Sequence, residues 1–173
     1  ENYIILKKKQ KMKKNNWEIA QRCALGSCEK KININISGMR QSSSILEISK
    51  IHTDLYPNSK NIDIEEISMF PLDNFKDQII SMEKNILLKI DTQGYELEIL
   101  KGAKKIFKFV NLLLVEVSLV ELYKSQPLFD EILSCVKELG FSIWSIDRAV
   151  TNYKTGQTYQ LDIPEGFVAS STG

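Results

Sequence analysis

The chain has 173 residues, of which 43% are hydrophobic and 26% charged, which favours one soluble domain with a sizeable core. A net charge of +1 gives no overall attraction to nucleic acid or membranes, and no apolar stretch approaches the roughly 18 residues of a spanning helix. Three cysteines and one histidine are too few for a disulfide framework or a zinc site, so we expect reduced, mostly buried thiols in a cytoplasmic protein.

The first part of the chain predicts one basic helix followed by strands and loops. Residues 2–14 have an apolar side and a lysine-rich side; the lysines could hold phosphate, but a solvated helix face is the simpler interpretation. Alternating apolar and polar residues predict strands at 17–25 and 32–36. Residues 38–44 are loop-like, and 45–56 predict a weak helix or an ordered loop.

Beyond Pro71 the hydrophobic pattern becomes regular. It predicts helices directly after Pro71 and at 95–109 and 127–139, and strands at 86–90, 112–117, 141–146 and 158–163. Strands alternating with helices in units of about 25 to 30 residues predict a parallel sheet with crossover helices. We expect the last two strands to form an antiparallel edge hairpin, and residues 168–173 to be a frayed tail.

Two carboxylates are predicted at the edge of this sheet where ligands bind, the carboxyl ends of its strands. Asp91 and Gln93 follow the strand at 86–90, and Glu116 ends the next strand. Because a buried carboxylate without a partner is costly, Asp91 needs a helix N-terminus, a cation or a ligand, and a simple helix cap explains it as well as a functional role. Glu116 stands between two valines, which slightly favours a functional partner over a partly exposed charge.

The segment ILLKIDTQGYELEILKGA at residues 86–103 resembles the KID-x-x-G-x-E-x-x-x-L-K-G signature of FkbM-type methyltransferases. VEVS at 115–118, LY at 122–123 and QPLF at 126–129 are similar to the family's next block. ALG at 24–26 and SSS at 42–44 are weaker matches to two earlier blocks. The resemblance implies the class I methyltransferase fold, a Rossmann-like, mostly parallel α/β sheet with flanking helices. It also implies transfer of the methyl group of S-adenosylmethionine to a hydroxyl, usually of a sugar or secondary metabolite.

The resemblance further implies roles for individual residues. Asp91 would lie near the methionine end of the cofactor or near the acceptor hydroxyl, and Gln93 would contact the cofactor. The adenine side would be lined by Ala24, Leu25 and Gly26.

The acceptor side of the site is less specific in the sequence. Ser42 and Ser43 would shape it, although an ordinary flexible loop explains the serines equally well. Glu116 would bind the acceptor or, together with Asp91, a hard cation, although two carboxylates are few ligands for a metal. His52 is the only imidazole and a candidate general base, while a lone surface histidine is the commoner case in so polar a setting.

One expected motif is missing from this sequence. The family binds its cofactor through a glycine-rich turn and an acidic residue that ends the second strand. In this sequence no two of the eight glycines are spaced as G-x-G. We therefore expect residues 1–173 to be a single methyltransferase domain without its N-terminal βαβ unit. Such a chain is expected to bind S-adenosylmethionine weakly or not at all on its own.

Two other functions remain open. The chain could be a non-catalytic α/β module that acts through a partner chain or as a homo-oligomer, or, less favoured, a nucleic-acid-binding protein that uses the lysine-rich helix. As a methyltransferase its partner would be a small-molecule or carbohydrate acceptor, with no role for a membrane.

Overall fold

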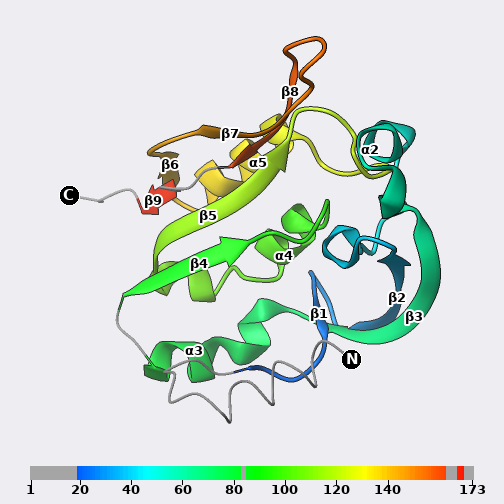
Figure 1. The fold of residues 1–173 in the computed structure, drawn as a ribbon. Coiled ribbons are helices and arrows are strands. Elements are labelled where there is room, and N and C mark those ends of the chain that lie inside the picture. Colours follow the sequence, from blue (N-terminus) through cyan, green and yellow to red (C-terminus); the bar gives the residue numbers. More distant parts are fainter. Residues whose placement is uncertain (1–18, 83–84, 163–166, 170–173) are drawn as a thin grey trace, which may run out of the picture.

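The computed structural model describes residues 19–82, 85–162 and 167–169, which form two mixed sheets with helices beside them (Figure 1). The lysine-rich helix expected at 2–14 lies outside the described residues. None of the helices in the described ranges combines the length and apolar character required to span a membrane.

The smaller sheet has the strand order β1-β3-β2. Its strands are β1 (Ala24–Leu25), β2 (Lys30–Ser37) and β3 (Asn61–Phe70), with β1 parallel and β2 antiparallel to β3. The connection from β2 to β3 carries three short helices, which are η1 (Arg40–Ser42), α2 (Lys50–Leu55) and η2 (Pro57–Ser59). This connection also pairs with the segment at 119–128 through an isolated antiparallel bridge between Ile48 and Tyr123.

The larger sheet is built around β5 and has the order β6-β9-β5-β8-β7, with β4 also paired to β5. Its strands are β4 (Ile86–Ile90), β5 (Val110–Ser118), β6 (Phe141–Ile143), β7 (Asp147–Thr151), β8 (Thr158–Asp162) and β9 (Phe167–Ala169). The pair β4–β5 is parallel, and the other pairs of this sheet are antiparallel.

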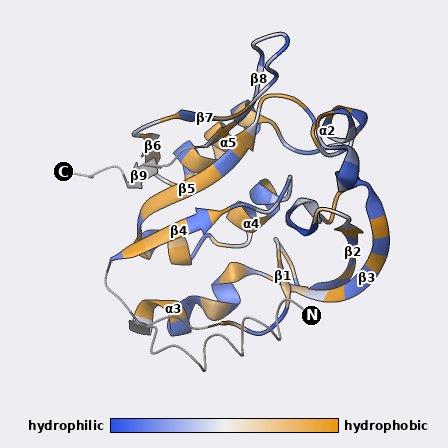
Figure 2. Ribbon diagram, in the orientation of Figure 1, coloured by the Kyte–Doolittle hydropathy of each residue, from blue (hydrophilic) through white to orange (hydrophobic). Residues whose placement is uncertain are grey.

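The remaining helices alternate with these strands. They are η3 (Leu72–Phe75), α3 (Lys76–Met82), α4 (Glu96–Lys101), η4 (Ile106–Phe109) and α5 (Phe129–Glu138). The main core lies where α4 and α5 pack on β5, around Leu100, Leu113 and Val136, each 0% exposed. Figure 2 shows the corresponding hydrophobic character of β4 and β5.

The α/β class and many of the expected elements are confirmed, among them the strands at β2, β4 and β5 and the helix at α5. The expectation of a mostly parallel sheet is not confirmed, because both sheets mix parallel and antiparallel pairs. An antiparallel hairpin does lie near the C-terminus, but β7 and β8 form it. The segment expected to be its first strand instead gives β6, which pairs with β9, so residues 168–169 are no frayed tail.

Three further expectations are wrong in their extent. The strand expected at 17–25 is, within the described residues, only β1, which pairs with β3 at Ala24 and Leu25. The helix expected at 95–109 divides into α4 and η4, because the carboxylate of Asp73 accepts the backbone N–H groups of Lys105 and Ile106 at 3.0 Å and so starts a new turn. The ten-residue β3 has no counterpart among the predicted elements.

Candidate functional site

The loop between β4 and α4, residues 91–95, lies at the carboxyl end of β4, where the sequence places the signature residues. Two consecutive residues have left-handed backbone, with φ of 58° at Gln93 and 97° at Gly94. A Cβ atom at Gly94 would also lie 3.1–3.3 Å from three neighbouring side chains. Glycine is therefore required there both for its backbone conformation and for the close packing.

The buried carboxylate of Glu96 holds this loop in shape. Its Oε1 accepts hydrogen bonds from the backbone N–H groups of Thr92 (2.9 Å) and Gly94 (3.1 Å) and from the Thr92 hydroxyl (3.3 Å). Glu96 is 4% exposed, and burial raises its pKa, against the opposite effect of these hydrogen bonds. The backbone N–H groups before α4 are thus bonded by Glu96, which leaves the Asp91 carboxylate available for other contacts.

Two carboxylates from neighbouring strand ends meet across one carboxamide. Nε2 of Gln93 donates hydrogen bonds to Oδ1 of Asp91 (2.9 Å) and to Oε2 of Glu116 (3.2 Å). Nε2 of Gln160, on β8, donates to the same Glu116 oxygen at 3.0 Å. Nζ of Lys89 lies 3.2 Å from Oδ2 of Asp91. We name Asp91, Gln93, Glu116 and Gln160 the carboxylate cluster.

Asp91 is the accessible carboxylate of this cluster. Its side chain is 37% exposed, whereas the other carboxylate of the cluster, Glu116, is half-buried. An exposed carboxylate of this kind can accept a proton from a hydroxyl group or attract a cationic ligand. Within the described ranges, no three or more histidine, cysteine, aspartate or glutamate side chains gather in a way that suits a metal ion.

The buried Tyr123 connects the cluster to the run of serines after β2. Its hydroxyl oxygen lies 2.9 Å from Oε1 of Gln93 and 3.2 Å from the carbonyl oxygen of Ser42. The Ser44 hydroxyl donates to the carbonyl oxygen of Gln93 at 2.7 Å. Ser43 instead turns back to β2, where its Oγ accepts a backbone N–H at 3.0 Å. The structure thus brings Ser42 and Ser44 to the cluster by contacts within the protein.

His52 is buried in α2, so its interpretation as a surface histidine is wrong. It is 4% exposed, and its ring centroid lies 5.1 Å from that of Tyr123 and 5.3 Å from that of Tyr56. Its Nδ1 is buried and has no hydrogen-bond partner among the residues that the structure describes. Burial lowers the pKa of His52, because the charged imidazolium would lose its hydration.

The weak ALG match lies at the smaller sheet. Gly26 donates its backbone N–H to the carbonyl oxygen of Phe70 at 3.0 Å, and a Cβ atom on Gly102 would lie 1.9 Å from the Gly26 carbonyl oxygen. Leu25 lines a cavity of 330 Å³ together with Leu72, Phe75, Ile79 and other residues. Ala24 pairs with β3. Of the three residues of this match, Leu25 is the one that lines this largely apolar cavity, which lies next to η3 and α3.

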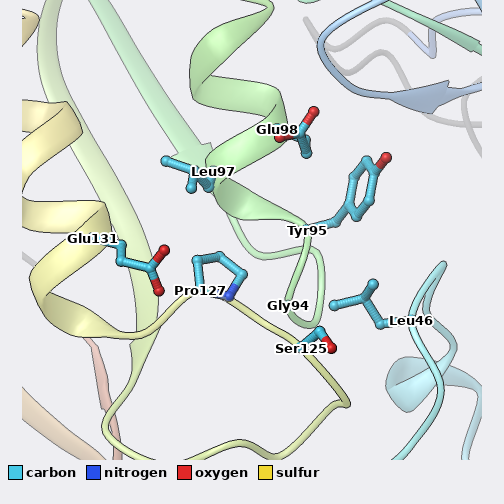
Figure 3. A pocket seen from close by; sticks show the side chains of 8 residues that line it. All are labelled: Leu46, Gly94, Tyr95, Leu97, Glu98, Ser125, Pro127 and Glu131. Atoms are coloured by element: carbon cyan, nitrogen blue, oxygen red, sulfur yellow. The ribbon is translucent and has the colours of Figure 1, made fainter.

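A second cavity, of 270 Å³, opens beside the signature loop (Figure 3). Its walls come from the loop, from α4, from the segment after Tyr123, from α5 and from the β2–β3 connection. The lining residues are Leu46, Gly94, Tyr95, Leu97, Glu98, Ser125, Pro127 and Glu131. Glu98 is paired with Lys101 at 2.7 Å and also accepts a hydrogen bond from Ser27. The hydrogen bond from Lys101, and to a smaller extent the one from Ser27, lowers the pKa of Glu98. The Glu98 carboxylate therefore presents a negative charge to this cavity.

Three residues of the site received no role from the sequence. Glu96 and Tyr123 both lie inside the segments that resemble the family, so their positions were visible although their contacts were not. Gln160 lies in none of those segments, and its contact with Glu116 joins residues 44 positions apart. No local pattern identifies such a residue, because the pairing of β5 with β8 brings it there.

The chain was also compared with known proteins. The family model described as the methyltransferase FkbM domain matches residues 1–143, a range that contains the signature loop and Glu116. No curated protein and no solved structure gives a significant match. A match over most of the 173 residues, with the signature residues folded into one strand-end site, establishes that the chain belongs to the FkbM family of methyltransferases.

Proposed function

We propose that this chain uses S-adenosylmethionine to methylate a hydroxyl group of a sugar or secondary-metabolite acceptor, with Asp91 as the proton acceptor. The observation that carries this proposal is the partly exposed Asp91 carboxylate at the end of β4, bonded by Gln93 beside Glu116. A carboxylate so placed can orient an acceptor hydroxyl and take its proton as the new O–C bond forms.

The described residues fit the bound cofactor in two respects. The carboxylates of Asp91 and Glu116 complement the positive charge at the methionine end of S-adenosylmethionine, and the apolar cavity lined by Leu25, Leu72 and Phe75 suits an adenine ring. When bound, the cofactor supplies an electrophilic methyl group on a sulfonium. The chain's own contribution is to place the acceptor oxygen and hold Asp91 ready for the proton.

We assign proton acceptance to Asp91 in preference to His52 because of exposure. The Asp91 side chain is 37% exposed, whereas His52 is 4% exposed and packed against two tyrosine rings. In this proposal His52 supports Tyr123 from behind, and the acceptor does not reach it.

A groove of 490 Å³ between α2 and the β7–β8 hairpin is the acceptor site of this proposal. Its lining includes the rings of Tyr56 and Tyr159 and the polar side chains of Asp54 and Asn152. Aromatic faces next to hydrogen-bonding groups suit a polyhydroxylated ring, which has apolar C–H faces and polar edges. The buried rings of His52 and Tyr123 lie between Tyr56 in the groove wall and Gln93 of the carboxylate cluster. In this proposal the groove therefore holds a part of the acceptor that is remote from the methylated hydroxyl.

The direct test is methyl transfer from labelled S-adenosylmethionine to a panel of sugars and polyhydroxylated metabolites, at cofactor concentrations far above the micromolar range. We expect Asp91→Asn to lower the transfer rate by roughly 100- to 10,000-fold, the usual contribution of a general base. The matched control is Asp77→Asn, which changes an exposed carboxylate on α3 that forms an ion pair with its neighbour Lys76. Equal rates in the two variants would refute the role of Asp91, and no transfer to any acceptor would refute the proposed function.

A second candidate function is a non-catalytic module that acts through a partner chain. It is favoured by the strand β4, which among the described residues pairs with β5 alone and carries the 58% exposed Leu87. Open strand edges promote pairing with another chain. Light scattering after size exclusion distinguishes the two candidates, because the module requires a stable oligomer or complex and methyl transfer does not.

A further inference from the structure

The carboxamide of Gln93 has only one orientation that satisfies its neighbours. Its nitrogen faces two carboxylate oxygens, Oδ1 of Asp91 and Oε2 of Glu116. Each carboxylate can only accept hydrogen bonds, and the amide nitrogen has two protons to donate. The opposite orientation would place the carbonyl oxygen of Gln93 against both carboxylates, which is repulsive.

Tyr123 completes this arrangement from the other side of the carboxamide. With the nitrogen committed to the carboxylates, Oε1 of Gln93 needs a donor, and the Tyr123 hydroxyl lies 2.9 Å away. Tyr123 is 1% exposed, and burial raises the pKa of its phenol far above the ordinary value. The hydroxyl therefore keeps its single proton, for which Gln93 Oε1 at 2.9 Å is a closer acceptor than the carbonyl oxygen of Ser42 at 3.2 Å.

The backbone of Gln93 is fixed as firmly as its side chain. The residue lies in the left-handed region with φ of 58°, a conformation that persists in a non-glycine residue only when surrounding contacts enforce it. One such contact is the 2.7 Å hydrogen bond from the Ser44 hydroxyl to the Gln93 carbonyl oxygen. Strained backbone of this kind is common where a side chain must be held for function.

We propose that Tyr123 and Gln93 are positioning residues that together form a clamp on the Asp91 and Glu116 carboxylates. Tyr123 orients the carboxamide, and the carboxamide holds the two carboxylates at a fixed separation although their charges repel. The inference rests on the proposed function for its purpose, which is to keep Asp91 aimed at the acceptor. It also gives Gln93 a role within the protein, in place of the direct cofactor contact implied by the family resemblance.

The clamp is testable without cofactor or acceptor, by the exchange of the Gln93 side-chain amide protons with solvent in nuclear magnetic resonance spectra of the full chain. We expect these protons to be protected in the wild type, and Tyr123→Phe to speed their exchange by roughly three- to tenfold, the range set by one net hydrogen bond. Tyr123→Phe keeps the aromatic ring that packs on His52. Backbone amide exchange in β5 reports whether the variant has loosened generally.

The matched control is Tyr56→Phe, which removes a hydroxyl from the other tyrosine that contacts His52 and should leave the Gln93 protons unchanged. Faster exchange in Tyr123→Phe alone supports the clamp, whether or not methyl transfer is observed. Equal exchange in both variants overturns it, even if methyl transfer is observed. Should Tyr123→Phe fail to fold, the exchange rate of the Gln93 side-chain protons in the wild type tests the clamp. Protection of these protons supports it, and exchange at the rate of free glutamine overturns it.

Discussion

The buried Glu96 is the residue on which the shape of the signature loop depends, and replacing it by alanine tests this directly. Glu96→Ala removes the acceptor of two backbone N–H groups, at Thr92 and at the buried Gly94. An N–H group left without a partner costs about 1–3 kcal/mol when buried and less when half-buried. We therefore expect a loss of roughly 2–4 kcal/mol in the free energy of unfolding, a large part of the stability of an ordinary domain.

Glu96→Gln is the matched variant, because its Oε1 can accept the same hydrogen bonds. Burial raises the pKa of Glu96, so a neutral side chain is not disfavoured there, and we expect glutamine to cost less than half as much as alanine. Urea unfolding followed by circular dichroism measures both changes; with a slope of about 2 kcal/mol per molar urea, alanine should lower the midpoint by roughly 1–2 M. An alanine variant as stable as the wild type, or a glutamine variant as unstable as alanine, would refute the reasoning.

Further predictions concern packing, backbone conformation and pH. Alanine at Gly102 would place its Cβ 1.9 Å from the Gly26 carbonyl oxygen, so we expect thermal unfolding to show a loss of at least about 3 kcal/mol. Alanine at Gly140, where φ is +88° and nothing lies within 4 Å, should cost only about 1–2 kcal/mol. Leu113→Ala leaves a cavity at a core position that is 0% exposed, so urea unfolding should show a loss of roughly 2–5 kcal/mol. A loss below about 1 kcal/mol would contradict this expectation. Burial lowers the pKa of His52 in the folded chain, so as the pH falls the unfolded chain binds a proton before the folded chain does. The contribution of His52 to the free energy of unfolding should be complete above about pH 6.5 and be lost as the pH drops toward the lowered pKa of the folded state. His52 is the only histidine, so His52→Phe should flatten this part of a plot of unfolding free energy against pH, and an unchanged slope would show that another group is responsible.

The family and the position of the site are consequences of local sequence. The signature segment gives a short apolar strand, a turn that needs glycine and a helix, and these features follow from hydrophobic pattern and backbone preference within a few residues. Asp91 and Glu116 were located for the same reason, because each follows or ends a strand whose apolar run is unmistakable. The family match over residues 1–143 confirms the family that the signature segment indicates.

The strand β3 shows where the local argument failed. Its sequence, NIDIEEISMF, alternates imperfectly, and Ile62 and Ile64 are 71% and 61% exposed. The register with β2 over Lys30–Ser37 decides its conformation, and a sequence pattern does not reveal which partner a strand will have. The mixed character of the sheets has the same origin, because strand direction is set by pairing.

By itself the sequence therefore determined the family, the α/β class and the two carboxylates at the strand ends. Only the tertiary structure decided what those carboxylates contact: Gln93 from the turn, Tyr123 from the segment after β5 and Gln160 from β8. It also placed His52 in the interior behind Tyr123. The physical reason is that strand and helix patterns arise from neighbours along the chain, whereas hydrogen bonds between side chains depend on the packing of distant segments.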